Sequence, residues 1–368
     1  MTRRTLLRST LRSTLQSALA AAALPFAAAT NTVQKWPLGI NTYCLRFQKW
    51  NDRQLFDYCV KEKLDAIFLQ DSLDPGAMDP KHWAEVRAWT QDTGLHIETG
   101  GGAILPKTAD GFAKSVATLR RNIERAKAMG SPIVRALLAG DRYSMPDDGP
   151  VEKHMETAIK ILREVRPQLL DAGIKIGIEN HKELMAWQTR QVIDAAGTDC
   201  AGSYLDTGNP VFVCEDPWTT VQELGPVAVS FHLRDSVVYE TPEGIAVQWV
   251  PLGEGTVDFK TLVAYAAGIL PKVYIYCKPI TARPPVILPV YKEEFWTKWF
   301  PKGRSRDLSR FMALAKRGRP YDKPQITGDV PELRAKYMDA LKVQQMDHMA
   351  KSLAYCRNVL DLGSRWRA

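Results

Sequence analysis

Short apolar runs alternate with longer segments of helical period from about residue 36 onward. Each run is followed by a loop of polar or glycine residues and then by one of these longer segments. Such alternation is typical of a parallel sheet whose strands are connected by helices. Eight runs have the length of buried strands: Leu38–Tyr43, Ala66–Leu69, His96–Thr99, Ile133–Leu137, Ile174–Ile178, Gly202–Leu205, Val227–Phe231 and Val273–Tyr276.

The segments between these runs read as helices. Examples are Asp52–Lys63, Lys81–Thr93, Ala109–Ala128, Val151–Asp171, Thr189–Ala196 and the string DFKTLVAYAAGIL. Eight strands in roughly 240 residues suit a closed barrel. An open doubly wound sheet would favour a glycine-rich turn after the first strand, and INTYCLRF has none. The pattern predicts an α/β fold, a (β/α)8 TIM barrel over residues 36–290.

Residues 291–368 contain aromatic and charged segments of helical period, such as EEFWTKWF, DLSRFMALAKRG and ELRAKYMDALKVQQMDHMAKSL. No linker of serine, glycine or proline separates them from the barrel. We expect a C-terminal helical extension packed on the barrel, with RGRPYDKPQITGDVP as a surface loop. Because such added helices often pair barrels, a homo-oligomer is an expectation by analogy.

The first 29 residues have the composition of an export signal. Four arginines and no acidic residue precede a small apolar run, and Ala27–Ala29 offers a cleavage site. The paired arginines of TRRTLLR favour a twin-arginine signal peptide. We therefore expect a periplasmic or secreted protein. No later segment reaches the roughly 20 apolar residues that a membrane helix needs, so the mature chain is not expected in the membrane.

The composition is that of a globular protein, with 45% hydrophobic and 24% charged residues. The formal charge is +8, but removal of the signal leaves 45 basic against 41 acidic residues, about +4. That charge is weak evidence for a polyanion, and we expect no nucleic-acid partner. The six cysteines form no CxxC pair and no disulfide-scaffold spacing, which indicates reduced thiols.

Polar side chains collect at the ends of three consecutive strands. In a barrel these ends meet at one mouth, where active sites form. Buried charges cost several kcal/mol unless they are paired or bound to a cation. The pattern therefore predicts a site that suits a divalent metal such as Mn, Co, Zn or Mg. Its residues are Glu179 and His181 after the fifth strand, Asp206 and Asn209 after the sixth, and His232, Arg234 and Asp235 after the seventh, with Glu254 in the next loop.

The strings IENHKEL, YLDTGNP, FHLRDS and PLGEGTVDF, in this order, resemble the sugar phosphate isomerase/epimerase family of the xylose-isomerase-like barrels. The resemblance covers about residues 36–363. It implies that Glu179, Asp206 and His232 are metal ligands. It also implies that Asn209, His181 and Arg234 or Asp235 contact substrate, a small sugar or keto sugar.

One position departs from the family pattern. The family has a second glutamate ahead of ITGRPP, whereas this chain reads YIYCKPITARPP and places Lys278 there. Epimerisation beside a carbonyl needs one group to remove a proton and another to return one, and lysine cannot replace a carboxylate ligand. Three outcomes are open: the ammonium replaces the metal, a three-ligand metal persists with Lys278 as acid or base, or the site only binds a ligand.

Two further residues are weaker candidates. His96 lies in GLHIETGGG, where the glycines would let the backbone approach a ligand, and we include it among the substrate-binding residues. Arg135, in the fourth run, either binds a substrate hydroxyl or carboxylate or braces the barrel, and bracing is favoured.

Three functions compete on this evidence. The first is a carbohydrate isomerase or epimerase that moves a proton next to a carbonyl, with Glu179 and Lys278 as catalytic residues. The second is a lyase or hydrolase of oxidised glycosides, and the third a non-catalytic periplasmic sugar-binding protein. No arginine-rich or glycine-rich phosphate cradle is evident, which favours an unphosphorylated substrate.

Overall fold

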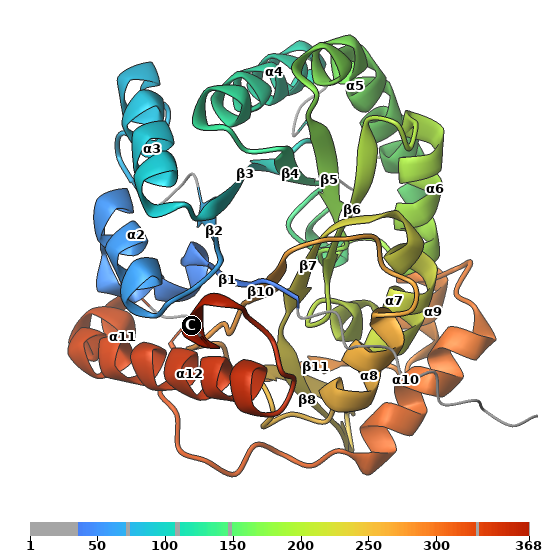
Figure 1. Ribbon diagram of the computed structural model, residues 1–368. Coiled ribbons are helices and arrows are strands. Elements are labelled where there is room, and N and C mark those ends of the chain that lie inside the picture. The colour runs from blue at the N-terminus through green and yellow to red at the C-terminus, as the bar shows by residue number, and fades with distance from the viewer. Residues whose placement is uncertain (1–35, 71–73, 107–110, 146–148, 329–330, 368) are drawn as a thin grey trace, which may run out of the picture. The chain divides into compact units, whose positions relative to one another are not determined.

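The eight predicted strands close into one parallel barrel in the computed structural model, which describes residues 36–70, 74–106, 111–145, 149–328 and 331–367 (Figure 1). The order around the barrel is β1-β10-β7-β6-β5-β4-β3-β2. The strands are β1 (Leu38–Asn41), β2 (Ala66–Gln70), β3 (His96–Ala103), β4 (Ile133–Leu137), β5 (Lys175–Glu179), β6 (Ala201–Asp206), β7 (Ala228–Leu233) and β10 (Ile275–Cys277). The predicted TIM barrel is confirmed. The export signal expected over residues 1–29 lies outside the described residues.

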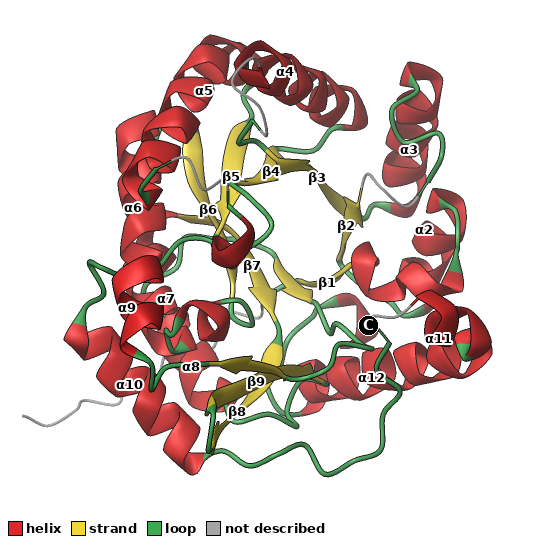
Figure 2. Cartoon of the chain, turned by 180° about the vertical axis from the view of Figure 1, so that it is seen from behind, coloured by secondary structure: helices red, strands yellow, loops and turns green. Residues whose placement is uncertain are grey.

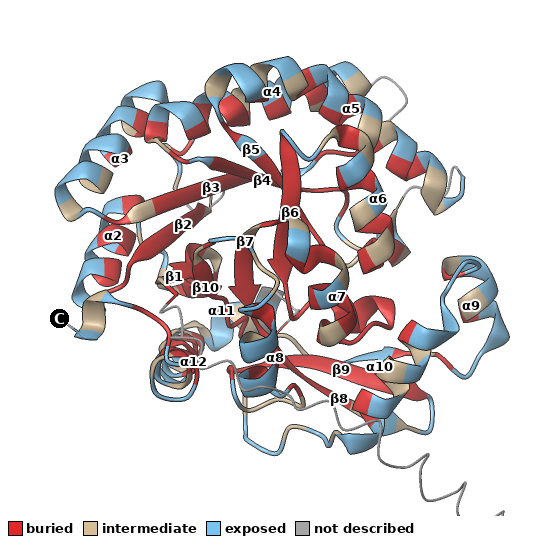
Figure 3. Cartoon of the chain, turned by 45° about the vertical axis from the view of Figure 1, so that its right-hand side comes forward, coloured by how far each residue is buried: buried red, intermediate tan, exposed pale blue. Residues whose placement is uncertain are grey.

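Seven helices cover the outside of the barrel, and their inward faces are buried while their outward faces are exposed (Figure 3). The longest, α5, buries Ile161, Val165 and Leu169 at helical spacing and ends at Gly173, whose φ of 64° suits a residue without a side chain. The helices are α2 (Asp52–Lys61), α3 (Pro80–Thr93), α4 (Phe112–Met129), α5 (Val151–Ala172), α6 (Ala186–Ala196), α7 (Pro217–Leu224) and α8 (Phe259–Ala266).

A small antiparallel sheet, which the sequence analysis did not predict, lies beside the barrel (Figure 2). It contains β8 (Asp235–Thr241), β9 (Gly244–Val250) and β11 (Val286–Leu288), in the order β11-β9-β8. β8 and β9 form a hairpin inserted between β7 and α8, and β11 pairs with β9 after the last barrel strand. The sheet therefore borders the ends of β7 and β10, where active-site residues are expected.

The chain after the barrel is helical, as α9 (Glu293–Trp299), α10 (Ser305–Arg317), α11 (Pro331–Lys336) and α12 (Met338–Asn358). Helix α12 contacts the 3-10 helix η1 (Thr42–Gln48) that follows β1, where Gln345 Oε1 accepts from the Phe47 backbone N–H at 3.0 Å. Its Ser352 Oγ accepts from the Leu252 N–H at 3.0 Å. In the described part of the chain, no helix is long and apolar enough to cross a membrane.

Aromatic rings fill the barrel interior below the polar ends of the strands. The rings of Tyr204 and Tyr276 stack on the His232 imidazole, with centroids 3.9 and 4.6 Å away, and Phe68 meets it edge-on at 5.6 Å. All four side chains are fully buried. This packing gives the polar residues above it a rigid floor.

Asp65, just before β2, joins the end of the chain to the barrel. Its carboxylate accepts from the backbone N–H of Leu38 at 2.8 Å, of Ser364 at 2.9 Å and of Arg365 at 3.1 Å, and from the Ser364 hydroxyl at 2.5 Å. Since these donors come from β1 and from the C-terminal segment, one buried side chain holds three parts of the chain together.

We predict that Asp65→Ala lowers the free energy of unfolding by about 2 kcal/mol, because it leaves the buried Leu38 N–H and the part-buried donors of Ser364 and Arg365 without an acceptor. Urea unfolding followed by circular dichroism measures the change. The matched control is Asp57→Ala, which removes an exposed carboxylate 3.1 Å from Arg53 and should change stability by less than about 0.5 kcal/mol. An equal effect of the two substitutions would contradict the role given to Asp65.

Candidate active site

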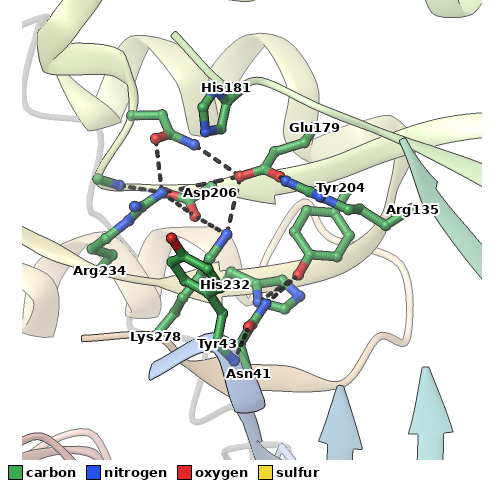
Figure 4. Close-up of polar contacts among 12 residues, drawn as sticks. Asn41, Tyr43, Arg135, Glu179, His181, Tyr204, Asp206, His232, Arg234 and Lys278 are labelled. Atoms are coloured by element: carbon green, nitrogen blue, oxygen red, sulfur yellow. Dashed lines mark hydrogen bonds and ion pairs between the residues drawn. The ribbon is translucent and has the colours of Figure 1, made fainter. Parts of the chain in front are cut away.

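Lys278 lies at the centre of the barrel mouth. It directly follows β10, and its backbone N–H donates to the carbonyl oxygen of Leu233 at 2.9 Å, which extends the pairing with β7. Its Nζ is 3.0 Å from Glu179 Oε1 and 3.0 Å from Asp206 Oδ2 (Figure 4). The ammonium thus connects the ends of β5 and β6 to β10, which β7 separates from β6 in the barrel order.

Two arginines complete the charged cluster. From β4, Arg135 donates through Nε to Glu179 Oε2 at 2.6 Å, and its Nη2 bonds the same oxygen. Arg234, which follows β7, donates through Nη2 to Asp206 Oδ2 at 2.7 Å and through Nε to Asp206 Oδ1 at 3.2 Å. Three cationic side chains therefore surround two buried carboxylates.

Asn209 links the two halves of this cluster. Its Nδ2 donates to Glu179 Oε1 at 3.0 Å, and its Oδ1 accepts from Arg234 Nη2 at 2.7 Å. The structure therefore brings together five of the residues in the predicted site, namely Glu179, Asp206, Asn209, Arg234 and Lys278.

The cluster sets the charge of both carboxylates. Burial alone would raise the pKa of Glu179, but Arg135 and Lys278 hold that pKa well below its usual value. Burial acts in the same way on Asp206, and Arg234 and Lys278 lower its pKa. Both carboxylates are therefore ionised, strongly bound to cations and weak proton acceptors.

A cavity of about 480 Å³ opens above Lys278. Its walls combine cationic and aromatic side chains, and Lys278, Arg135 and Arg234 form part of its floor. Among the predicted residues, His181 lines it directly, with Nδ1 3.5 Å from Glu183 Oε2. The remaining walls include Tyr43, Gln70, Lys182, Phe212, Trp249 and Arg283.

His232 is separate from the two carboxylates, contrary to the expected ligand set. Its Nε2 is 3.0 Å from Ser230 Oγ, and its Nδ1 is 2.9 Å from Tyr204 Oη. Because Ser230 donates to Glu98 Oε2 at 2.6 Å, it accepts from His232, which places the proton on Nε2. Burial, with Lys278 nearby, keeps the His232 pKa well below its ordinary value. The ring is a neutral part of the barrel core.

Asp235 and Glu254 stabilise loops and do not line the cavity, although both were predicted to bind substrate. The Asp235 carboxylate accepts from the backbone N–H groups of Gly253 at 3.0 Å and Gly255 at 2.9 Å. Glu254 points away from that turn and binds Lys323 Nζ at 2.5 Å and the hydroxyl of Tyr321. Both predictions followed from position along the chain, which does not fix the direction in which a side chain points.

His96 lies at the other end of the barrel. It begins β3, whereas Glu179 ends β5, and in a parallel barrel these positions are on opposite faces. Its ring stacks on Tyr274 with centroids 3.7 Å apart, and it lines a second cavity of about 740 Å³. The structure therefore does not bring His96 to the site of Glu179 and Lys278.

Sequence reasoning missed several cavity residues. Arg135 was assigned to bracing, yet it binds Glu179 and faces the cavity. Lys182 and Arg283 stand inside the quoted strings IENHKEL and ITARPP, so their proximity to the site was available from the motifs. Trp249 was not, because it belongs to the hairpin that the strand pattern did not reveal.

Residues 56–268, more than half of the chain, match the sequence model described as xylose isomerase-like TIM barrel. The chain belongs to this family. A curated relative, 3-oxo-isoapionate decarboxylase of Pectobacterium atrosepticum, is 23% identical over 190 residues, which are 50% of this chain and 62% of the relative. The chain thus spans about three fifths of that enzyme's length.

Two solved structures illustrate the shared fold. D-psicose 3-epimerase, solved in the presence of D-fructose, superposes with a TM-score of 0.56 at 15% identity, covering 88% of this chain and 99% of the epimerase. A family protein from Mycobacterium smegmatis, in complex with magnesium, gives a TM-score of 0.54 at 19% identity and covers 66% and 90% of the two chains. At these identities the likeness shows the fold alone.

A divalent metal such as the magnesium of the Mycobacterium smegmatis structure does not fit between Glu179 and Asp206. Three cationic side chains already offset two carboxylates, so the cluster carries a surplus positive charge that a metal would increase. Both nitrogens of His232 are engaged elsewhere. The charge of this cluster, rather than the fold, therefore makes the site unsuitable for a divalent metal.

A different group has the spacing of metal ligands. Asp52, Asp74 and His82 place three ligand atoms within 4.8 Å of one another at the starts of α2 and α3, and the cluster includes no residue that lines the cavity above Lys278. His82 Nε2 lies 2.9 Å from Asp52 Oδ2. Metal measurements on the barrel mouth must therefore control for this cluster.

We predict that Lys278→Glu gives the barrel mouth a site for one Mn²⁺, because the charged cluster changes from three cations and two carboxylates to two cations and three carboxylates. The protein with Lys278 should bind no Mn²⁺ there. Titration calorimetry with MnCl₂ measures both, with Asp52→Asn in each protein to remove the outer cluster. Stoichiometric Mn²⁺ in the Asp52→Asn protein that keeps Lys278 would refute the charge argument.

Proposed function

We propose that the protein is a carbohydrate-modifying enzyme that forms an enolate next to the carbonyl group of an oxidised sugar, with the Lys278 ammonium as the electrophile. The observation that carries this proposal is the position of Lys278. An ammonium has three N–H donors, and two of them point at Glu179 and Asp206 at 3.0 Å. Because Lys278 also lines the cavity, the third donor can reach a ligand oxygen.

Charge stabilisation is the main task of such a site. When a bond beside a carbonyl breaks and leaves its electron pair on carbon, the charge moves to the carbonyl oxygen. A preorganised cation in a buried site stabilises that oxyanion strongly. Glu179 and Asp206 hold the ammonium in place, and Arg135 and Arg234 fix the carboxylates in turn. The five side chains act as one rigid electrostatic unit.

A lyase reaction is favoured over epimerisation. Epimerisation needs one group that removes a proton from carbon and another that returns one on the opposite face. Glu179 and Asp206 are weak bases here because cations hold their pKa values low. Bond cleavage that leaves the electron pair on carbon needs only a proton donor afterwards. The decarboxylase relative supports this reaction class, and His181 is the cavity residue best suited to carry that proton.

We expect the purified protein in D₂O to introduce deuterium at the carbon beside the carbonyl of a keto sugar, with methyl 3-oxo-β-D-glucopyranoside and D-fructose as probes. Proton NMR follows the exchange, in which His181 removes the carbon-bound proton, exchanges it with solvent and returns a deuteron to the enolate. One proton carrier is enough for this exchange, and no second bond has to break. Lys278→Met should slow exchange at least about 100-fold, the size of effect that follows loss of one oxyanion donor. Excess EDTA should change the rate less than about twofold, because Lys278 supplies the charge.

The controls separate loss of chemistry from loss of folding. Lys278→Arg keeps a cation at the centre and should retain part of the exchange, and near-UV circular dichroism checks the packing of each variant. Sugar binding without any exchange would support the alternative of a binding protein. Abolition of exchange by EDTA would instead favour a metal-dependent epimerase.

His181→Asn should lower the exchange rate about 100-fold while the affinity for the sugar changes little, since a lost proton carrier affects the rate more than binding. The measurement is the same NMR assay, with sugar affinity measured by titration calorimetry. A variant with an unchanged exchange rate would assign proton transfer to another group, such as Tyr43 or water.

A further inference from the structure

Two carboxylates and one imidazole lie together in the outer layer of the barrel, where α2 and α3 are side by side (Figure 1). Asp52 is the first residue of α2, Asp74 lies between β2 and α3, and His82 is in the first turn of α3. Each places one ligand atom within 4.8 Å of the other two. Because the three residues belong to three segments of the chain, an ion bound by all of them would connect these segments.

The Asp52 carboxylate is buried with one of its oxygens unused. Its Oδ2 lies 2.9 Å from His82 Nε2, whereas its Oδ1 has no hydrogen-bond partner among the described residues. Asp52 is only 1% exposed, so bulk solvent does not reach this oxygen. A buried charged oxygen without a partner is costly, and a cation bound at the cluster would satisfy it.

The cluster carries more negative than positive charge. In the described part of the chain, His82 is the only basic side chain at ion-pairing distance from Asp52 or Asp74. Arg125 acts on Asp52 from further away. On the other side of the ring, His82 Nδ1 lies 3.5 Å from Oε2 of a third carboxylate, Glu85. A divalent ion would offset the two inner carboxylates and be bound by a neutral imidazole, with Nδ1–H directed to Glu85. The barrel mouth has the opposite balance, because three cations surround two carboxylates there.

The surrounding structure holds the ligand atoms in place. Asp74 accepts from the Asp52 N–H through Oδ2 at 3.1 Å and from the Gly76 N–H through Oδ1 at 2.7 Å. The His82 ring meets Trp89 edge-on, with centroids 5.8 Å apart. Neighbouring ligands around an octahedral ion with bonds of about 2.1 Å are about 3.0 Å apart, close to the 2.9 Å between Asp52 Oδ2 and His82 Nε2. Asp74 and His82 are partly exposed, so an ion can enter from solvent.

We propose that Asp52, Asp74 and His82 form a binding site for one divalent transition-metal ion, such as Mn²⁺ or Zn²⁺, which stabilises the packing of α2 against α3. Carboxylate oxygens and an imidazole nitrogen are ligands of both ions. The site is separate from the barrel mouth, because none of its residues lines the cavity above Lys278. The proposal therefore does not depend on the proposed function.

Titration calorimetry with MnCl₂ and with ZnCl₂ tests the site, on protein stripped with EDTA and then freed of it. At least one of the two ions should bind, at one ion per chain. A saturating concentration should raise the thermal unfolding midpoint by about 3 °C, because the ligands separate when α2 and α3 come apart. Binding of neither ion would overturn the proposal and leave an ion pair between Asp52 and His82.

Asp52→Asn and His82→Gln should each weaken binding of that ion at least about tenfold, because each removes one ligand. Asp57→Asn, which changes an exposed carboxylate on the same helix, is the matched control and should keep the affinity within about twofold. Near-UV circular dichroism checks folding, and His82→Gln changes a partly exposed side chain. Unchanged affinity in both variants would place the ion elsewhere and overturn the assignment.

The deuterium exchange assay keeps this inference apart from the proposed function. Asp52→Asn should remove the rise in thermal midpoint and leave the exchange rate within about twofold. If EDTA abolishes exchange and Asp52→Asn does not, the chemistry assigned to Lys278 is wrong and the outer site stands. If exchange depends on Asp52 as strongly as on Lys278, the ion is not a separate structural one and this inference is overturned.

Discussion

The contact of one ammonium with two carboxylates organises the barrel mouth. Lys278 joins β10 to the ends of β5 and β6, and without it Glu179 and Asp206 would be like charges in a buried site. Each arginine hydrogen-bonds a single carboxylate, and Arg234 Nη2 comes no closer than 4.0 Å to Glu179 Oε1. The lysine is the only member of this cluster that contacts both carboxylates within 3.0 Å. Its charge therefore lowers the pKa of both partners, in addition to the effect of Arg135 on Glu179 and of Arg234 on Asp206.

The aromatic layer beneath Lys278 contains His232, which has to be neutral for this arrangement of charges to be stable. A protonated His232 directly beneath Lys278 would add a second buried cation, and burial beside Lys278 keeps its pKa low. The chain of contacts from Glu98 through Ser230 to His232 and Tyr204 fixes the neutral tautomer, and Tyr204 also accepts from Asn41 Nδ2 at 3.0 Å. A histidine that a metal site would use as a ligand is thereby a structural part of the core.

The fold was predictable from the sequence because its signal is repeated. Eight apolar runs followed by helical segments are compatible with few alternative folds. An error in where one strand or helix ends does not change the predicted fold. The β8–β9 hairpin was missed because β9 is buried along its whole length and shows no alternation of apolar and polar residues. A buried strand of this kind next to β7 reads as a continuation of the barrel pattern.

The site was predictable only in part, for a related reason. Position at a strand end identified Glu179 and Asp206, and the departure from the family string ITGRPP identified Lys278. Position along the chain could not give the direction of a side chain, so Asp235 and Glu254 were placed in the site although they bind loop backbone and Lys323. His96 was misplaced because a strand has two ends and only one faces the mouth. The sequence pattern predicted where the backbone lies, whereas the contacts of the side chains could be seen only in the structure.

The substitution of an ammonium for a metal limits the chemistry more than it limits binding. A divalent ion with open positions can hold two substrate oxygens together, as an enediolate requires. An ammonium with two of its three donors committed to Glu179 and Asp206 has one left, so it can stabilise one developing oxyanion. Any second substrate oxygen must then be held by other groups. Tyr43 and His181, which line the cavity beside Lys278, are polar side chains that this chain offers for that contact.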